Sequence, residues 1–254
     1  MTVTAVLTDL AADVRAALGA VIDPELDEPI TDLGFVRSVR VDGADVEVHL
    51  RLPTSFCAPN FAYLMASDAL DAVRAVPGTG HVVVELDDHH DSDLINRGLA
   101  AAAGYRGTFG HEAEDSLDEL RATFTRKAHT AAMERAVTAL LRADRSVTEA
   151  DVHGLTLGDL PDGPATDALL RRRAAVGLPP DPAAPALVEA DGGRPAPAAA
   201  ALFLRKARSV RISIDGNAHF CRGLLATRYP GAEADQTPRP DPDSRTLLPL
   251  EVLP

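Results

Sequence analysis

One of the two cysteines of the chain lies where a strand-like run gives way to a helix-like run, in the stretch LPTSFCAPNFAYLM. Unpaired N–H groups at a helix N-terminus favour a thiolate, so Cys57 is a candidate soft-metal ligand or nucleophile. Thr54 or Ser55 is expected to cap this helix, with Pro59 in its first turn. The alternative is that Cys57 packs as a small hydrophobe in the apolar stripe of the helix. Position alone leaves both interpretations open.

A second group of chemically capable residues follows a hydrophobic run in LDDHHDSD, residues 86–93. Imidazole and carboxylate together suit iron, zinc or manganese, and a strand end is where an α/β sheet usually presents ligands. Strand alternation would send Asp87 and His89 to one side of the sheet and Asp88 and His90 to the other. The alternative is a solvated acidic loop.

Three further motifs carry weaker signals. In DPELDEP, Asp23 and Glu25 could bind a hard cation, but the spacing is not that of a calcium loop, and a capped turn is the simpler interpretation. In HFCRG, Cys221 lies two residues after His219 near an expected strand–helix junction, which is half a metal site at best. GYRGTFG lacks the pattern of a phosphate loop and is expected to be a linker.

The first part of the chain must position Cys57 and the acidic group. Apolar residues at helical spacing predict a helix over residues 8–20, and alternating residues predict a hairpin that turns at Asp42-Gly43. A second helix then leads to a third strand over residues 82–86. This helix-strand-strand-helix-strand order predicts a small α+β domain over residues 1–92.

The remainder is expected to be a mostly helical α/β domain, residues 93–230, followed by a Pro- and Asp-rich tail, residues 231–254. Helices are predicted near residues 92–104, 116–143 and 171–176. A short strand after residue 186 and another over residues 209–214, SVRISI, complete the prediction.

Composition bounds the class of protein. Of 38 acidic residues 22 precede residue 121, against only 7 of 25 basic ones, which argues against a nucleic-acid surface in the first half. The run Arg171–Arg173 is better explained by a solvated face or a contact with the acidic half than by an RNA site. No apolar run is long enough to cross a bilayer, no leader pattern is visible, and two cysteines are too few for a disulfide framework. A cytoplasmic protein is expected.

The ordered stretches DPELDEPITDLGFVRSVRV, VEVHLRLPTSFCAPN and VVVELDDH carry a family resemblance. With them, residues 8–90 resemble the iron–sulfur (metal–sulfur) cluster assembly domain of the SufT-like and PaaD-like proteins. The whole chain resembles a longer actinobacterial-type variant with a C-terminal extension, suspected of serving diiron monooxygenases. The resemblance makes Cys57 the main functional residue, with Thr54, Asp23 and Glu25 as further candidates for binding the cargo. Relatives often have Pro directly after the Cys, where this chain has Ala58.

Our leading hypothesis is therefore an accessory factor that assembles or inserts an iron or iron–sulfur centre into a client metalloenzyme, or works with other iron–sulfur assembly proteins. Cys57 would hold the metal transiently, assisted by His89, Asp87 and Cys221, and a homodimer is one expected arrangement. The first rival is a protein-interaction adaptor or chaperone without metal. The second is a metal-dependent hydrolase built on the DDHH group and His219. We expect an assembly factor rather than a turnover enzyme, with neither nucleic acid nor membrane as a partner.

Overall fold

The computed structural model of the chain describes residues 3–110 and 117–231, and the predicted tail lies almost wholly outside them. The chain forms two compact units. Unit 1 comprises residues 1–21, 29–108 and 224–254, and unit 2 comprises residues 22–28 and 109–223. The boundary predicted after residue 92 thus falls inside unit 1.

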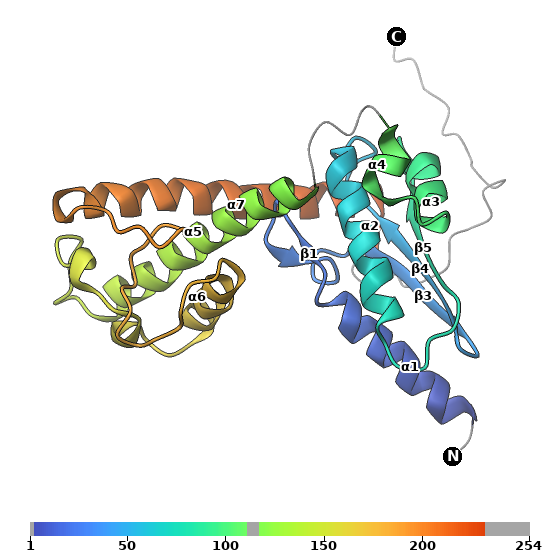
Figure 1. Ribbon diagram of the computed structural model, residues 1–254, viewed down its shortest axis with the longest axis horizontal. Coiled ribbons are helices and arrows are strands. Elements are labelled where there is room, and N and C mark those ends of the chain that lie inside the picture. The colour runs from blue at the N-terminus through green and yellow to red at the C-terminus, as the bar shows by residue number, and fades with distance from the viewer. Residues whose placement is uncertain (1–2, 111–116, 232–254) are drawn as a thin grey trace, which may run out of the picture. The chain divides into compact units, whose positions relative to one another are not determined.

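Unit 1 is built on a three-stranded sheet in the order β3-β4-β5 (Figure 1). Strand β3 (Val36–Asp42) pairs antiparallel with β4 (Asp45–Arg51), and β4 pairs parallel with β5 (Val82–Asp87). The predicted hairpin is confirmed, although its loop residues are Gly43 and Ala44, one position later than expected. Gly43 has φ 63°, which glycine adopts without steric cost.

Two helices of unit 1, α1 (Val3–Leu18) and α2 (Pro59–Arg74), pack on the sheet and on each other (Figure 1). Because α2 connects β4 to β5, the two strands run parallel, as a β-α-β crossover requires. The alternate strand residues that face the helices are buried: Val46, Val48, Leu50, Val82, Val84 and Leu86. The predicted helix-strand-strand-helix-strand order and the α+β class are therefore confirmed.

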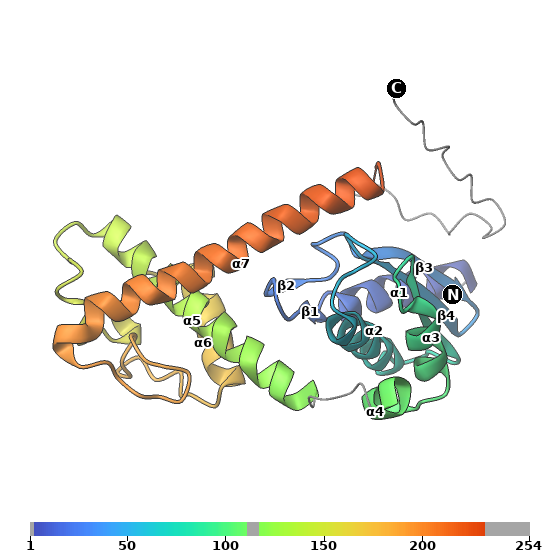
Figure 2. The same ribbon diagram turned by 90° about the horizontal axis from the view of Figure 1, so that it is seen from above.

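Helix α3 (Ser92–Ala100) lies along β5 and protects the edge of the sheet (Figure 2). The carboxamide of Asn96 accepts the Leu86 N–H at 2.9 Å and donates to the Leu86 carbonyl at 3.2 Å. This side chain takes the place of a neighbouring strand, so the backbone polar groups of Leu86 are satisfied.

The prediction of a linker at GYRGTFG is wrong, because Gly104–Phe109 is helix α4. Thr108 donates to the Gly104 carbonyl at 2.8 Å and packs on α3. A Cβ atom on Gly98 would lie only 2.1 Å from the Thr108 Oγ1. The glycine on α3 therefore allows the close approach of α4, which a count of glycines in the sequence cannot reveal.

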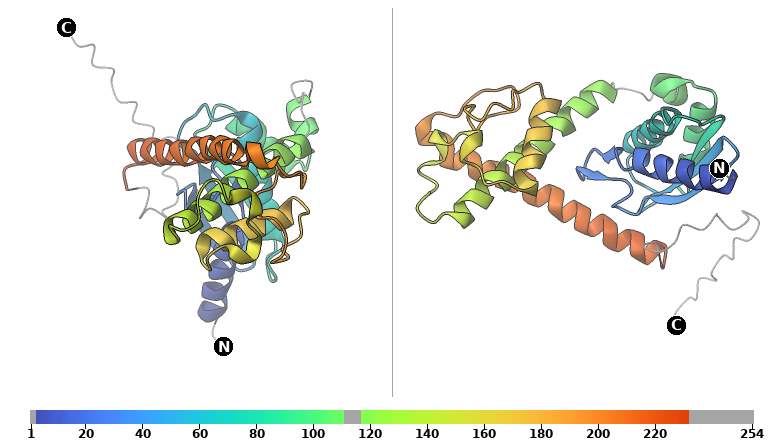
Figure 3. Two further views of the ribbon diagram at one scale, coloured as in Figure 1. Left: turned by 90° about the vertical axis from the view of Figure 1, so that its left-hand side faces the viewer. Right: turned by 90° about the horizontal axis from the view of Figure 1, so that it is seen from below.

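Unit 2 is mostly helical in the residues that the structure describes, apart from the short strands over residues 22–23 and 28–29 and one isolated bridge between Thr156 and Pro185. Helices α5 (Leu117–Ala143) and α6 (Pro164–Ala175) lie side by side, and α7 (Ala200–Arg228) contributes its residues up to Gly223 (Figure 3). The short 3-10 helices are η2 (Val152–Gly154), η3 (Leu157–Asp159) and η4 (Pro197–Ala199). The core is aliphatic and includes Met133, Val137, Leu140, Val152, Leu169, Leu187 and Leu204.

Helix α7 overturns the strand predicted at SVRISI, and the strand predicted after residue 186 is wrong because residues 186–190 form a loop. Apolar residues at 210, 212 and 214 alternate over only six residues, whereas the buried residues of the whole helix recur three to seven apart at Leu204, Ala207, Ile214, Ala218 and Leu225. The helical repeat is longer and prevails over the local alternation. Ile212 is accordingly 55% exposed.

The basic run on α6 is engaged within unit 2. Arg172 bonds to Asp27 at 2.8 Å, and the buried Arg173 donates to the carbonyls of Pro179 and Pro185 at 3.2 Å. The predicted contact of this run with the acidic half of the chain is thus confirmed.

The buried His129 on α5 should make the stability of the chain depend on pH. The side chain is fully buried, and neither ring nitrogen has a hydrogen-bond partner in the part of the chain that the structure describes. Burial, with a smaller effect of the Arg173 charge, lowers the pKa of His129 from 6.5 to about 4. Between pH 6.5 and pH 4, His129 is protonated in the unfolded chain and neutral in the folded chain. The free energy of unfolding therefore falls as the pH drops from 6.5 to 4, and it is unaffected above pH 6.5. The loss should be about 2–3 kcal/mol.

We expect His129→Leu to flatten this fall, measured as the urea midpoint of the helical circular-dichroism signal at several pH values. His219→Gln, which changes an exposed histidine of α7, serves as the control and should keep the unaltered profile. An equal loss of stability at acid pH in the His129→Leu chain would contradict the assignment of this loss to His129.

None of the helices over residues 3–110 and 117–231 is both long and apolar enough to cross a membrane.

Candidate functional site

Cys57 lies in the loop between β4 and α2 and is half-buried. The prediction that Thr54 or Ser55 caps the helix is wrong, because α2 begins at Pro59 and its N-cap is Ala58, which makes no side-chain cap. Pro59 does stand at the start of the helix, as predicted. The thiol therefore comes one residue before the cap, and the loop rather than the first helical turn sets its position.

Thr54 shapes this loop instead of capping the helix. Its Oγ1 accepts the Phe56 N–H at 3.2 Å, a local turn typical of threonine, and lies 3.4 Å from the Cys57 Sγ. Phe56 points outward, with 81% of its surface exposed, and its ring stacks on that of His90 at 6.0 Å. The thiol thus has a hydroxyl beside it and an exposed aromatic ring next to it in the chain.

His89 fixes the loop from the other side. Its Nε2–H donates to the Cys57 carbonyl at 2.8 Å, while its Nδ1 accepts the Asp91 N–H at 3.1 Å. Because a carbonyl only accepts, these bonds define a neutral imidazole with both nitrogens engaged. The His90 N–H also donates to the Ser55 carbonyl at 2.9 Å. The structure therefore brings His89 and Cys57 together, with the imidazole against the backbone of Cys57.

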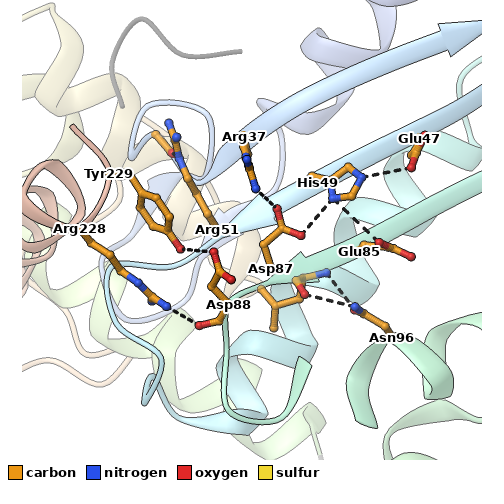
Figure 4. A network of polar contacts seen from close by, with 12 residues as sticks. Arg37, Glu47, His49, Arg51, Glu85, Asp87, Asp88, Asn96, Arg228 and Tyr229 are labelled. Carbon is orange, nitrogen blue, oxygen red and sulfur yellow. Dashed lines mark hydrogen bonds and ion pairs between the residues drawn. The ribbon is translucent and has the colours of Figure 1, made fainter. Parts of the chain in front are cut away.

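The turn that directs His89 toward Cys57 is made by Asp88, which has φ 53°, an uncommon value for a residue other than glycine. This turn ends the strand alternation, so Asp87 and His89 do not face one site as the sequence predicted. Asp87 is 1% exposed and accepts from Arg37 at 2.9 Å and from His49 Nδ1 at 3.1 Å (Figure 4). Its carboxylate is thus part of an ion-pair network on the sheet.

His49 completes that network, since its Nε2 lies 3.1 Å from a Glu47 carboxylate oxygen (Figure 4). The hydrogen bond to Asp87, opposed by burial and assisted by the charges of Asp87 and Glu85, raises the pKa of His49. The outer face of the strands thus carries a histidine held between carboxylates, which favour its protonated form.

Asp23, Glu25 and Cys221 belong to unit 2, whereas Cys57 and His89 belong to unit 1. Asp23 Oδ1 accepts the N–H groups of Glu25 and Leu26 at 2.8 and 2.9 Å, so it caps the turn between the short strands β1 (Ile22–Asp23) and β2 (Glu28–Pro29). Burial raises the pKa of this carboxyl to about 6, against the effect of those two bonds.

Two other candidate residues, Glu25 and Cys221, also belong to unit 2. Glu25 accepts from Asn217 at 3.2 Å. Cys221 lies inside α7 rather than at a strand–helix junction.

Across residues 3–110 and 117–231, no group of three or more His, Cys, Asp and Glu side chains is arranged to hold a metal ion. The Cys57 loop offers one soft ligand near the surface on a fixed backbone. A single thiolate can share a metal with ligands from another molecule, which is the requirement for transfer rather than storage.

Sequence reasoning missed three residues next to this loop, namely Arg51, Arg228 and Tyr229. Arg51 lies 5.3 Å from the ring centre of Tyr229, and Arg228 donates to the Leu52 carbonyl at 3.1 Å. No pattern in the stretch CRGLLATRY, residues 221–229, assigns a role to Arg228 and Tyr229 without the fold.

Comparison with known proteins places the site in context. Residues 11–86 match the model of the iron-sulfur cluster assembly protein family. The iron-sulfur cluster carrier protein of Mycobacterium tuberculosis is 43% identical over 79 residues, and that of Mycobacterium leprae is 39% identical over 80 residues. Each match covers 31% of this chain and 20% of the relative, so the chain spans about a fifth of the length of these relatives. No solved structure matches the chain.

The matched residues take in the second half of α1, the hairpin, the Cys57 loop, α2 and nearly all of β5. They end just before the turn at Asp88, and α3 to α7 lie outside them. Residues 11–86 are thus similar to the iron-sulfur cluster assembly protein family, and this similarity covers less than half of the chain.

Proposed function

We propose that this chain is an accessory factor that takes up an iron or iron–sulfur centre transiently on Cys57 and delivers it to a client metalloenzyme. The observation that carries the proposal is the placement of Cys57: a half-buried thiol on a loop held by His89 and Thr54, within the residues that match the assembly family. The centre is cargo in this scheme, so it is bound and then released.

An incomplete ligand set supports delivery. Iron–sulfur clusters are usually held by four cysteine thiolates, and a closed set would retain the cluster. Cys57 supplies one, and the others come from the donor, the acceptor or a second copy of the chain. Exposed Phe56 beside the thiol gives such a partner an apolar contact at the point of transfer. The resemblance to longer variants makes a diiron monooxygenase the client we favour.

Anaerobic incubation with ferrous iron and sulfide tests the proposal. We expect visible sulfide-to-iron charge-transfer absorption, protein-bound iron after gel filtration, and loss of both when an apo-ferredoxin is added as acceptor. Absence of bound iron would overturn the proposal and favour the adaptor, whose Cys57 only packs.

A further inference from the structure

We propose that the end of α7 with the residue after it, residues 224–229, braces the Cys57 loop, and that Arg228 and Tyr229 are positioning residues for the thiol. The inference rests on the proposed function only in so far as that function makes the Cys57 thiol a ligand of the cargo. The contacts all lie within unit 1, which includes residues 224–254.

Arg228 joins the two chain segments that meet at the site. Its guanidinium donates to the Leu52 carbonyl at 3.1 Å. It also donates to the Asp88 carbonyl (Figure 4). Leu52 precedes the Cys57 loop and Asp88 precedes His89. The planar, many-donor guanidinium is suited to bridging two fixed acceptors, which the single ammonium of lysine does less well.

Tyr229 contacts the same turn through the side chain of Asp88. Its hydroxyl donates to Asp88 Oδ2 at 3.2 Å, and its ring lies against the guanidinium of Arg51 (Figure 4). Arg51 is 1% exposed and donates to the Gly34 carbonyl at 3.1 Å. Burial raises the pKa of Tyr229 to about 12, so the phenol remains a hydrogen-bond donor at neutral pH.

These bonds converge on a residue with an uncommon backbone conformation. Asp88 at φ 53° is in the left-handed region, which few residues other than glycine adopt. Arg228 holds its carbonyl and Tyr229 holds its carboxylate, and the resulting turn carries His89 to the Cys57 carbonyl. The end of α7 therefore stabilises the conformation on which the His89–Cys57 contact depends.

Apolar packing seats the same turn. Leu225 is 3% exposed, and its Cδ2 lies 3.0 Å from where a Cβ atom on Gly34 would be. Gly34 also has φ 76°, a conformation that favours glycine, and a larger residue there would have to displace the Leu225 side chain. Residues far beyond the matched segment thus complete the surroundings of the loop inside it.

Thiol reactivity tests the brace without any metal. In a Cys221→Ser background Cys57 is the only cysteine, so its alkylation by iodoacetamide can be followed by mass spectrometry across pH. Loss of two hydrogen bonds worth about 1 kcal/mol each should make Arg228→Gln react about fivefold to thirtyfold faster, and Tyr229→Phe about twofold to fivefold faster. We expect Arg228→Lys to fall between them, a changed pH–rate profile, and faster hydrogen exchange in residues 52–58 and 87–91.

Arg205→Gln is the matched control, because Arg205 is an exposed arginine of α7 within unit 2. Its chain should keep the unaltered rate and pH profile. Unchanged alkylation and exchange in both Arg228→Gln and Tyr229→Phe would overturn the inference, and Tyr229→Phe alone decides if Arg228→Gln does not fold. Failure to load iron would leave this result intact and reject only the proposed function.

Discussion

Replacing Cys57 with Ser should reduce iron bound after anaerobic reconstitution to less than about a tenth of that of the unaltered chain. The thiolate is the ligand in our proposal, and a serine hydroxyl does not ionise at neutral pH to replace it. The fold should persist, because Cys57 is half-buried and its carbonyl, which His89 holds, is unchanged. Iron analysis and circular dichroism of the same samples measure both effects.

Cys221→Ser is the matched control, since it removes the other cysteine of the chain. We expect it to retain most of the bound iron, because Cys221 belongs to α7 in unit 2. If both variants lose iron equally, the two thiols share the cargo. If the Cys57→Ser chain loads iron fully, Cys57 is only packing and the proposal fails.

The sequence predicts the three-stranded sheet of unit 1 and the two helices that pack on it, because short-range patterns determine them. Glycine at position 43 closes the hairpin, and the β-α-β crossover fixes a parallel third strand. The same order brings the end of β5 next to the loop after β4, so His89 near Cys57 follows from topology. The single backbone turn at Asp88, which separates Asp87 from His89, does not follow from the topology.

Long-range contacts account for the residues that sequence reasoning missed. Nothing in residues 221–229 indicates that Arg228 and Tyr229 meet Leu52 and Asp88, more than 130 positions earlier. The strand predicted at SVRISI failed for a related reason, because its six residues alternate while the helix around them is 29 residues long. Local sequence patterns predict the elements that local interactions determine. The contacts of Arg228 and Tyr229 with the Cys57 loop and the turn at Asp88 depend on tertiary packing instead.

The second large effect is expected for Asp87→Asn, which distinguishes a metal ligand from a structural carboxylate. Asp87 is 1% exposed and pairs with Arg37, whose side chain is 9% exposed. Removing one charge of a buried pair typically costs about 3–5 kcal/mol, because the other charge loses its compensation. We expect that loss in urea unfolding of unit 1, followed by hydrogen exchange in β3 and β4.

Glu85→Gln is the control, on the same strand and two residues earlier, where the side chain is 45% exposed and 4.0 Å from His49. It should cost less than about 0.5 kcal/mol. Asp87→Asn should also move the titration of His49 to lower pH, because the Asp87 hydrogen bond is the main cause of its raised pKa. Nuclear magnetic resonance of the imidazole protons measures this shift.

Iron loading of the folded Asp87→Asn fraction then decides the role of this carboxylate. A structural carboxylate committed to Arg37 and His49 predicts unaltered iron per folded molecule, whereas a metal ligand predicts its loss. Replacing the pair together, as Arg37→Met with Asp87→Leu, should recover much of the stability, since apolar isosteres avoid the cost of desolvating two charges. If the double variant recovers stability and still binds iron, Cys57 is the ligand that this unit contributes. If the double variant is stable but loses iron, Asp87 is a metal ligand.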